Sequence, residues 1–313
     1  MLTAIRKPKV GIALGAGAAR GWSHIGVLNE LVENGFTPDI VAGASIGAVV
    51  GGCFAAGKLA ELEAFARSMT RRRVFSLMDI SFSGKCLIGG ARLRNLLRGQ
   101  LGDLRLEQTP IRFAAVATEV GLGHEIWLSS GDMVDALCAS YSLPGIFEPV
   151  KIGGRWLFDG ALVNPVPVTI CRALGADVVI AVNLVSDTMF RGTIIRDAGR
   201  ERGSDAPEPM TLETADERPR SFSSRLQIFK RKPRRIVAPG FARTMVDAFN
   251  IAQDRIARSR LAGDPPDVLV NARLGRIGLF DFNRAEELIA FGREAVRHVL
   301  PELTALLEDL TVA

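Results

Sequence analysis

The stretch from Asp39 to Ala56 constrains the fold more than any other part of this sequence. It opens with a short apolar run, passes through Gly43-Ala44-Ser45-Ile46-Gly47, and continues into small and apolar residues that are typical of a tightly packed helix. This order predicts a strand, a sharp turn and a helix. A Gly-x-Ser-x-Gly pattern in that context indicates a nucleophile elbow, in which Gly43 and Gly47 omit side chains that would clash where strand and helix meet.

Ser45 is therefore the candidate nucleophile. Its predicted position at a helix N-terminus places the hydroxyl oxygen near backbone amides and a helix dipole that favour developing negative charge. The alternative is a glycine-rich packing turn with no chemistry. Because a serine hydroxyl is a weak nucleophile at its ordinary pKa, catalysis also needs a base and an oxyanion hole elsewhere in the chain.

A second glycine-rich loop precedes this stretch. Lys9–Leu14 predicts a strand, Trp22–Asn34 predicts a helix, and the residues between them read Gly15-Ala16-Gly17-Ala18-Ala19-Arg20-Gly21. Together with the elbow, these segments predict a βαβα unit whose two strands are parallel and buried. The glycine-rich loop and Ser45 should then lie at the same carboxyl edge of the sheet, where sites in open α/β sheets form.

The loop is suited to an oxyanion hole because its glycines and small alanines let successive N–H groups point at one oxygen. We expect Gly17 and Ala18 to be the donors, with Gly15 and Gly21 completing the loop. Arg20 should anchor the loop on a carboxylate or carbonyl group; contact with an anionic head group is the alternative. A dinucleotide-binding loop is disfavoured, because Arg20 occupies the position of the last fingerprint glycine and no acidic residue ends the next strand.

Asp159 is the candidate base. It follows the apolar Trp156-Leu157-Phe158, and burial there would raise the basicity of its carboxylate toward neutrality. The alternative for this residue is an ordinary Asp-Gly turn. Ser45, Asp159 and His298 also follow the serine, acid, histidine order of α/β-hydrolases, but His298 lies inside a helical pattern.

The other two histidines are weaker candidates. We expect a structural role for His24, in the first turn of a helix, and an exposed position for His124, in a glycine-rich hairpin. With three histidines and four widely spaced cysteines, the chain predicts no metal centre, and neither a metal nor an organic cofactor is expected. None of the cysteines forms a Cys-x-x-Cys pair, which indicates reduced thiols in a cytosol. The four are Cys53, Cys86, Cys138 and Cys171.

Composition supports a globular chain with a sizeable core, since 48% of the 313 residues are hydrophobic. Two apolar stretches, 10–19 and 40–57, imitate a signal peptide and a membrane span, but several glycines interrupt each of them. We therefore expect a cytoplasmic protein. Peripheral contact with the inner face of the membrane is an option that the charge pattern leaves open.

The net charge is +5, and basic residues gather in two clusters, Arg71–Arg73 and Lys230–Arg235. Such clusters suit an anionic membrane surface or nucleic acid, although a solvated face is the more common explanation. Aromatic residues do not alternate with the basic ones in a stacking pattern, so no nucleic-acid partner is expected. The sequence does not indicate an oligomeric state.

The chain divides by composition into three parts: a core at 9–185, a charged, serine- and proline-rich insertion at 186–239 that we expect to be variable and partly disordered, and C-terminal helices with a strand at 240–313 that pack on the core. Within the core, 75–91 is an apolar connection that predicts a lid, part of an acyl pocket, or a loop packed on the core. Near Pro301 the last helix could break.

Three motifs in this order and spacing give a resemblance to a known family: Gly15-x-Gly17-x-x-Arg20-Gly21, Gly43-x-Ser45-x-Gly47 and Asp159-Gly160-Ala161. The chain resembles the patatin-like phospholipases, and among them the bacterial RssA-type proteins related to the catalytic domain of neuropathy target esterase. The resemblance covers about 9–185, with weaker similarity across the C-terminal helices.

The resemblance implies a three-layer α/β/α fold with a mostly parallel central sheet and a serine–aspartate dyad that hydrolyses ester bonds of lipids or phospholipids. Ser45 would then be the nucleophile, Asp159 the base and Gly15–Gly21 the oxyanion loop. Patatins often have three consecutive glycines where this chain has Ala16-Gly17-Ala18, which leaves the amide donors in place but narrows the approach to the ester. The competing hypothesis is a lipid-binding or regulatory protein on the same fold, without turnover.

Overall fold

The computed structural model describes residues 7–77, 89–184 and 241–312, apart from 273, 275–276 and 279. Within these ranges the chain forms a central sheet of eight strands in the order β5-β6-β3-β2-β1-β7-β8, with β4 paired to β3. The strands are β1 (Val10–Leu14), β2 (Ile40–Ala44), β3 (Arg112–Glu119), β4 (Glu125–Leu128), β5 (Val150–Ile152), β6 (Arg155–Asp159), β7 (Val178–Asn183) and β8 (Val268–Asn271).

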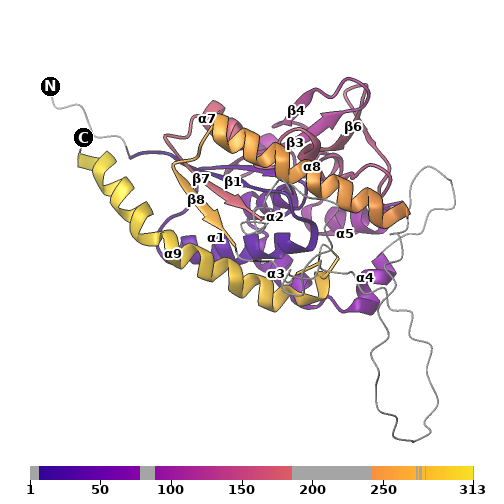
Figure 1. Ribbon diagram of the computed structural model, residues 1–313, viewed down its shortest axis with the longest axis horizontal. Coiled ribbons are helices and arrows are strands. Elements are labelled where there is room, and N and C mark those ends of the chain that lie inside the picture. The colour runs from indigo at the N-terminus through magenta and orange to yellow at the C-terminus, as the bar shows by residue number, and fades with distance from the viewer. Residues whose placement is uncertain are drawn as a thin grey trace, which may run out of the picture.

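The helices of the described residues lie on both faces of this sheet (Figure 1). They are α1 (Ser23–Glu33), α2 (Ile46–Ala55), α3 (Leu59–Arg67), α4 (Arg71–Leu77), α5 (Ala91–Leu101), α6 (Met133–Tyr141), α7 (Val168–Ala173), α8 (Phe241–Gly263) and α9 (Ala285–Val312). Short 3₁₀ turns complete the chain: η1 (Ala18–Trp22), η2 (Leu106–Gln108), η3 (Gly160–Leu162) and η4 (Phe282–Arg284).

The topology confirms the predicted βαβα unit. Strands β2, β1, β7 and β8 are parallel to their neighbours, and β2 is also parallel to β3, whereas β4, β5 and β6 form antiparallel pairs. The predicted hairpin at 151–161 is present, with Gly153 and Gly154 both at positive φ in its turn. The sheet is therefore mixed and mostly parallel.

Alternating side chains along the strands supply two separate cores. Ile12, Leu14 and Val41 face a large cluster that includes α1, α2, α6 and α9, while Ala13 and Ala42 face a smaller cluster with α7 and α8. Because successive side chains of a strand point to opposite faces, one sheet can bury both layers. The expected three-layer α/β/α architecture is thus confirmed.

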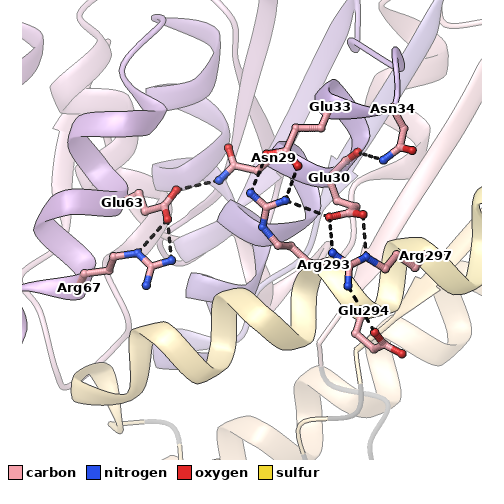
Figure 2. A network of polar contacts seen from close by, with 9 residues as sticks. All are labelled: Asn29, Glu30, Glu33, Asn34, Glu63, Arg67, Arg293, Glu294 and Arg297. Atoms are coloured by element: carbon pink, nitrogen blue, oxygen red, sulfur yellow. Dashed lines mark hydrogen bonds and ion pairs between the residues drawn. The ribbon is translucent and has the colours of Figure 1, made fainter.

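Helix α9 is held against α1 by a close backbone approach and by ion pairs. A Cβ atom on Gly26 would lie 1.9 Å from the Ile289 carbonyl oxygen, and one on Gly292 would lie 1.9 Å from the Ser23 carbonyl oxygen. Glycine at both positions is what allows the two helices to touch. Beside this contact, Glu30 accepts hydrogen bonds from Arg293 and Arg297, as Figure 2 shows.

Two expectations about local structure were wrong. Helix α9 continues through Pro301 without a break. Pro301 is exposed, so water can bond the carbonyl group one turn earlier that loses its intrahelical partner. The connection expected from residue 75 begins later, because 75–77 form the last turn of α4.

Some expectations fall on residues that the structure does not describe. They are the remainder of the apolar connection at 78–88, the insertion at 186–239, the basic cluster Lys230–Arg235, and Cys86. The other three cysteines are buried and unpaired. Among the described residues, no helix is both long and apolar enough to cross a membrane.

Candidate active site

Strand register brings Ser45 and Asp159 together. Strand β2 pairs with one edge of β3 as far as Ala44, which lies opposite Val116. Strand β6 continues along β3 from the next residue, with Asp159 opposite Ala117. Because β2 and β6 run in opposite directions on β3, their C-terminal ends meet, and residues 114 positions apart in sequence become neighbours. The Ser45 Oγ donates a 2.7 Å hydrogen bond to the Asp159 Oδ2.

Ser45 has the strained backbone expected of an elbow. Its φ of 56° and ψ of −124° lie outside the regions that non-glycine residues usually adopt. The turn is tight: a Cβ atom on Gly43 would lie 2.5 Å from the Ala48 Cα, and one on Gly47 would lie 2.2 Å from the Leu14 carbonyl oxygen. The Ser45 amide donates a 3.0 Å hydrogen bond to the buried Ser140 Oγ, which helps to hold this conformation.

Asp159 is almost completely buried, with 1% of its surface exposed. Burial raises the pKa of its carboxyl group to about 7, while hydrogen bonds from the Ser45 hydroxyl and the Ala161 amide act in the opposite direction. The Ala161 amide donates to Asp159 Oδ1 at 2.8 Å, so Oδ2 faces Ser45 alone. A carboxylate with a pKa near neutrality can accept a proton from a hydroxyl without being too weak a base.

The glycine-rich loop offers amide donors beside Ser45. Gly15 and Ala16 already donate their amides to the carbonyl groups of Val182 and Pro165, at 3.0 and 2.9 Å. In the part of the chain that the structure describes, no acceptor is bonded to the amides of Gly17 and Ala18, which begin the turn into η1. Ala18 has a φ of 50°, a left-handed conformation that is unusual for alanine. The amides of Gly17 and Ala18, the two predicted donors, are thus among those that the described part of this loop leaves without an acceptor.

The side chains of His24 and Arg20 hold this loop in place through hydrogen bonds. His24 is fully buried, and its Nε2–H donates a 2.7 Å hydrogen bond to the Gly15 carbonyl. Burial lowers the pKa of this imidazole to about 4, so it stays neutral. Arg20 Nε donates to the Ile277 carbonyl at 3.0 Å, in agreement with the anchoring role expected for it. Gly21 provides close contact, because a Cβ atom there would lie 2.2 Å from the Ile46 side chain.

The structure does not bring the other histidines to Ser45. His298 is an exposed residue of α9 whose Nδ1 bonds the Glu294 carbonyl of its own helix. His124 is also exposed and bonds Glu119 through Nδ1 at 2.7 Å. Neither residue lines the pocket that contains Ser45 and Asp159.

That pocket is an apolar cavity of about 270 Å³. Its walls come from α2, α3, α4, α5, α6, α8 and η4. Apolar side chains make up most of the lining, and representative ones are Val49, Leu62, Phe65, Leu97, Ile146 and Phe147. Val74 and Leu77 of α4 also contribute. Leu77 belongs to the stretch 75–91, for which part of an acyl pocket was one of the three expectations.

Sequence reasoning missed three features of the site. The first is Ile46, the first residue of α2, whose amide has no intrahelical acceptor because it lies in the first turn. The elbow motif itself could have indicated this amide as a further candidate donor beside Gly17 and Ala18. Ser140 bears no motif, and only the fold places it behind Ser45. The third feature is a pair of amide side chains on α8, Asn250 and Gln253, that line the pocket.

Comparisons with known proteins agree with this architecture. The family described as patatin-like phospholipase matches residues 12–172. An uncharacterized NTE family protein of Mycobacterium bovis is 31% identical over 94% of this chain and 91% of its own length. The chain belongs to the patatin-like phospholipase family, which confirms the resemblance seen in the three motifs.

Other relatives match a smaller share of the chain. Lysophospholipase nte1 of Emericella nidulans is 32% identical over 56% of this chain, which corresponds to 12% of that much longer protein. A second NTE family protein of Mycobacterium bovis is 34% identical over 56% of this chain and 30% of its own length. Among solved structures, VipD from Legionella pneumophila aligns with half of this chain at 14% identity and a TM-score of 0.33, which is too low to assign a fold. Membership of this family suggests lipid esterase or phospholipase activity.

Proposed function

We propose that the protein is a carboxylic ester hydrolase that cleaves acyl esters of lipids with a Ser45–Asp159 dyad. The observation that carries the proposal is the 2.7 Å hydrogen bond from the Ser45 hydroxyl to a buried carboxylate whose pKa is raised to about 7. Acyl transfer requires a hydroxyl activated by a base whose pKa is near the working pH. It also requires backbone amides that are free to bond the developing oxyanion.

The reaction would proceed in two steps. Asp159 accepts the Ser45 proton as Oγ attacks the acyl carbonyl carbon, and the amides of Gly17 and Ala18 stabilise the negative oxygen of the tetrahedral intermediate. The protonated Asp159 then gives its proton to the leaving alcohol. Water, deprotonated by the same carboxylate, releases the fatty acid from the acyl-serine and restores the free enzyme.

The pocket supports a lipid as the source of the acyl group. Its lining is almost wholly apolar and begins at Ser45, so a hydrocarbon chain bound there would bury its surface next to the nucleophile. The relative in Emericella nidulans is named a lysophospholipase, which is consistent with this substrate class. We propose phospholipids, lysophospholipids and simpler acyl esters as the class to screen.

Helix α4 is our candidate for peripheral membrane contact. Its basic cluster, Arg71–Arg73, is exposed, and Phe75 on the same helix has 70% of its surface exposed. The helix contributes Val74 and Leu77 to the pocket, so an attached bilayer would lie near the entrance. Sedimentation with vesicles containing an anionic phospholipid should fall in the variant with Arg71 and Arg72 changed to glutamate.

A fluorophosphonate probe tests the proposed dyad directly, because it labels activated serines. We expect labelling at Ser45, located by mass spectrometry of the labelled peptide, and loss of labelling in Ser45→Ala and Asp159→Asn. Ser68→Ala, which removes an exposed hydroxyl far from the motifs, is the matched control and should label normally. Full esterase activity in Ser45→Ala would contradict the assignment. Lipid binding by a folded protein that is never labelled would favour the non-catalytic alternative.

A further inference from the structure

Two amide side chains in the pocket have no bonding partner among the described residues. Gln253 of α8 lines the cavity and has 5% of its surface exposed, and Asn250, one turn earlier, lines it as well. Residues three apart share one face of a helix, so both amides project toward the same space. Both amides border the open space of the cavity, so a ligand that displaces water from it has to supply them with new hydrogen-bond partners.

The helix places these amides beside the proposed dyad. Helix α8 packs against η3, the turn that directly follows Asp159, and Ala257 of α8 lies in the same buried cluster as Ala161 of η3. Gln253 precedes Ala257 by one turn, and it lines the same pocket as Ser45 and Asp159. A ligand that fills this pocket can therefore contact both Gln253 and Ser45.

The chemistry of the pocket indicates which ligand group this is. A carboxamide presents a donor and an acceptor, as does a hydroxyl group, so the two can form a pair in which both are satisfied. A phosphate offers acceptors alone and calls for cationic partners. Among the described residues of the lining, the one cationic side chain is Lys58, which is already paired with Glu61 at 2.8 Å.

We propose that Gln253, assisted by Asn250, binds a free hydroxyl group next to the acyl ester, and thereby selects hydroxyl-bearing lipid esters over purely apolar ones. The inference rests on the proposed ester hydrolysis, which it deepens by naming a specificity determinant. Such a site discriminates because an ester without the hydroxyl leaves the buried amide unbonded in the complex.

The test compares two isosteric substrates, 2-hydroxyethyl dodecanoate and propyl dodecanoate, which differ by a hydroxyl in place of a methyl group. We expect the full-length protein to favour the hydroxyethyl ester by about 5- to 30-fold in kcat/KM. In Gln253→Met, which keeps the length of the side chain, the ratio should approach 1 through loss of hydroxyethyl hydrolysis alone. Asn250→Leu should lower the ratio less, because Asn250 is only half-buried.

Gln100→Met is the matched control. Gln100 also lines the pocket but is exposed on α5, so water satisfies its amide and the ratio should not change. Protection of Ser45 from the fluorophosphonate by each ester compares the apparent affinities of the two esters, and labelling itself reports separately on the dyad. An equal preference in the wild-type protein would overturn the inference. So would an unchanged ratio in Gln253→Met, or an equal loss on both esters with a lower Tm, which is the signature of a structural role.

Discussion

The polar side chains where α9 meets α1 differ from Gln253 of α8 in their hydrogen bonding. On α9, Arg293 and Arg297 are bonded to Glu30 and Glu33 of α1 (Figure 2). Two glycines let the backbones of these helices touch. On α8, Gln253 is buried beside the pocket with no partner among the described residues. The comparison separates two situations: Glu30 is buried and bonded by two arginines that join the helices, whereas Gln253 lines a cavity, where we propose that it meets a ligand.

Asp159 lines the same pocket as Gln253, and it contrasts with Glu30. Its carboxylate is buried without a cationic partner, and the raised pKa reflects the cost of charging it there. Glu30 shows the reverse, because the hydrogen bond from Arg297, reinforced by Arg293, holds the pKa of its carboxyl group below the ordinary value in spite of burial. Two carboxyl groups of similar exposure therefore have pKa values that are shifted in opposite directions.

The largest effect should come from removing the proposed base. We expect Asp159→Asn to lower kcat by about 10²- to 10⁴-fold, since the amide keeps the shape of the side chain but does not accept the Ser45 proton. The measurement is hydrolysis of an acyl ester by the purified variant, with circular dichroism to verify folding. Asp103→Asn, at a fully exposed carboxylate, should be unaffected. Activity within a few fold of the wild type in Asp159→Asn would remove Asp159 from the mechanism.

The next effect is on pH dependence. The pKa of Asp159 rises from 3.8 to about 7 on folding, so the folded state binds this proton more tightly than the unfolded state does. The free energy of unfolding should therefore decrease as pH rises from about 4 to 7, by about 4 kcal/mol at most from this residue. Over the same range kcat/KM should increase as the carboxylate ionises.

Denaturant unfolding of the wild type and of Asp159→Asn at pH 5, 6, 7 and 8 measures this contribution. The variant lacks the titrating group, so its advantage in stability over the wild type should grow with pH and level off above pH 7. A difference that stays constant with pH would mean that the pKa of Asp159 is not raised.

The seam between α1 and α9 should be the most sensitive structural contact. Gly26→Ala places a methyl group against the Ile289 carbonyl, and the two helices would have to separate. We expect a loss of about 3 kcal/mol in the free energy of unfolding, the upper end for overpacking, because the clash is with backbone. Gly99→Ala is the matched control, since a Cβ atom there meets no atom within 4 Å, and it should stabilise α5 by about 0.5–1 kcal/mol. Equal effects at the two positions would contradict the proposed close contact.

The smallest of these effects concerns the ion pairs. Glu30→Gln should lower the free energy of unfolding by about 1–2 kcal/mol, because Arg293 and Arg297 lose a buried charged acceptor. Glu294→Gln, which changes an exposed partner of Arg297, should have an effect within about 0.5 kcal/mol. Thermal unfolding of both variants compares the two sites, and a neutral Glu30→Gln would show that these ion pairs add little to the apolar packing and the glycine contact of α9.

Features predicted well from the sequence are those that depend on nearby residues. The strand, turn and helix around Ser45, the glycine-rich loop and the hairpin before Asp159 each have a local pattern, and their elements lie where expected. Helix α4 was missed because Val74 is its one buried residue, so no apolar periodicity marks it. The continuity of α9 at Pro301 depends on exposure, which a local pattern does not report.

By itself the sequence determined the family, the βαβα unit and the residues proposed for chemistry, because strained turns and close backbone approaches demand glycine at particular spacings. Tertiary structure alone decided that β2 and β6 meet end to end on β3, which sets the Ser45–Asp159 distance and buries the carboxylate. It also decided that Gln253 faces the pocket. Distances and burial of this kind arise from segments far apart in the chain, and no local pattern encodes them.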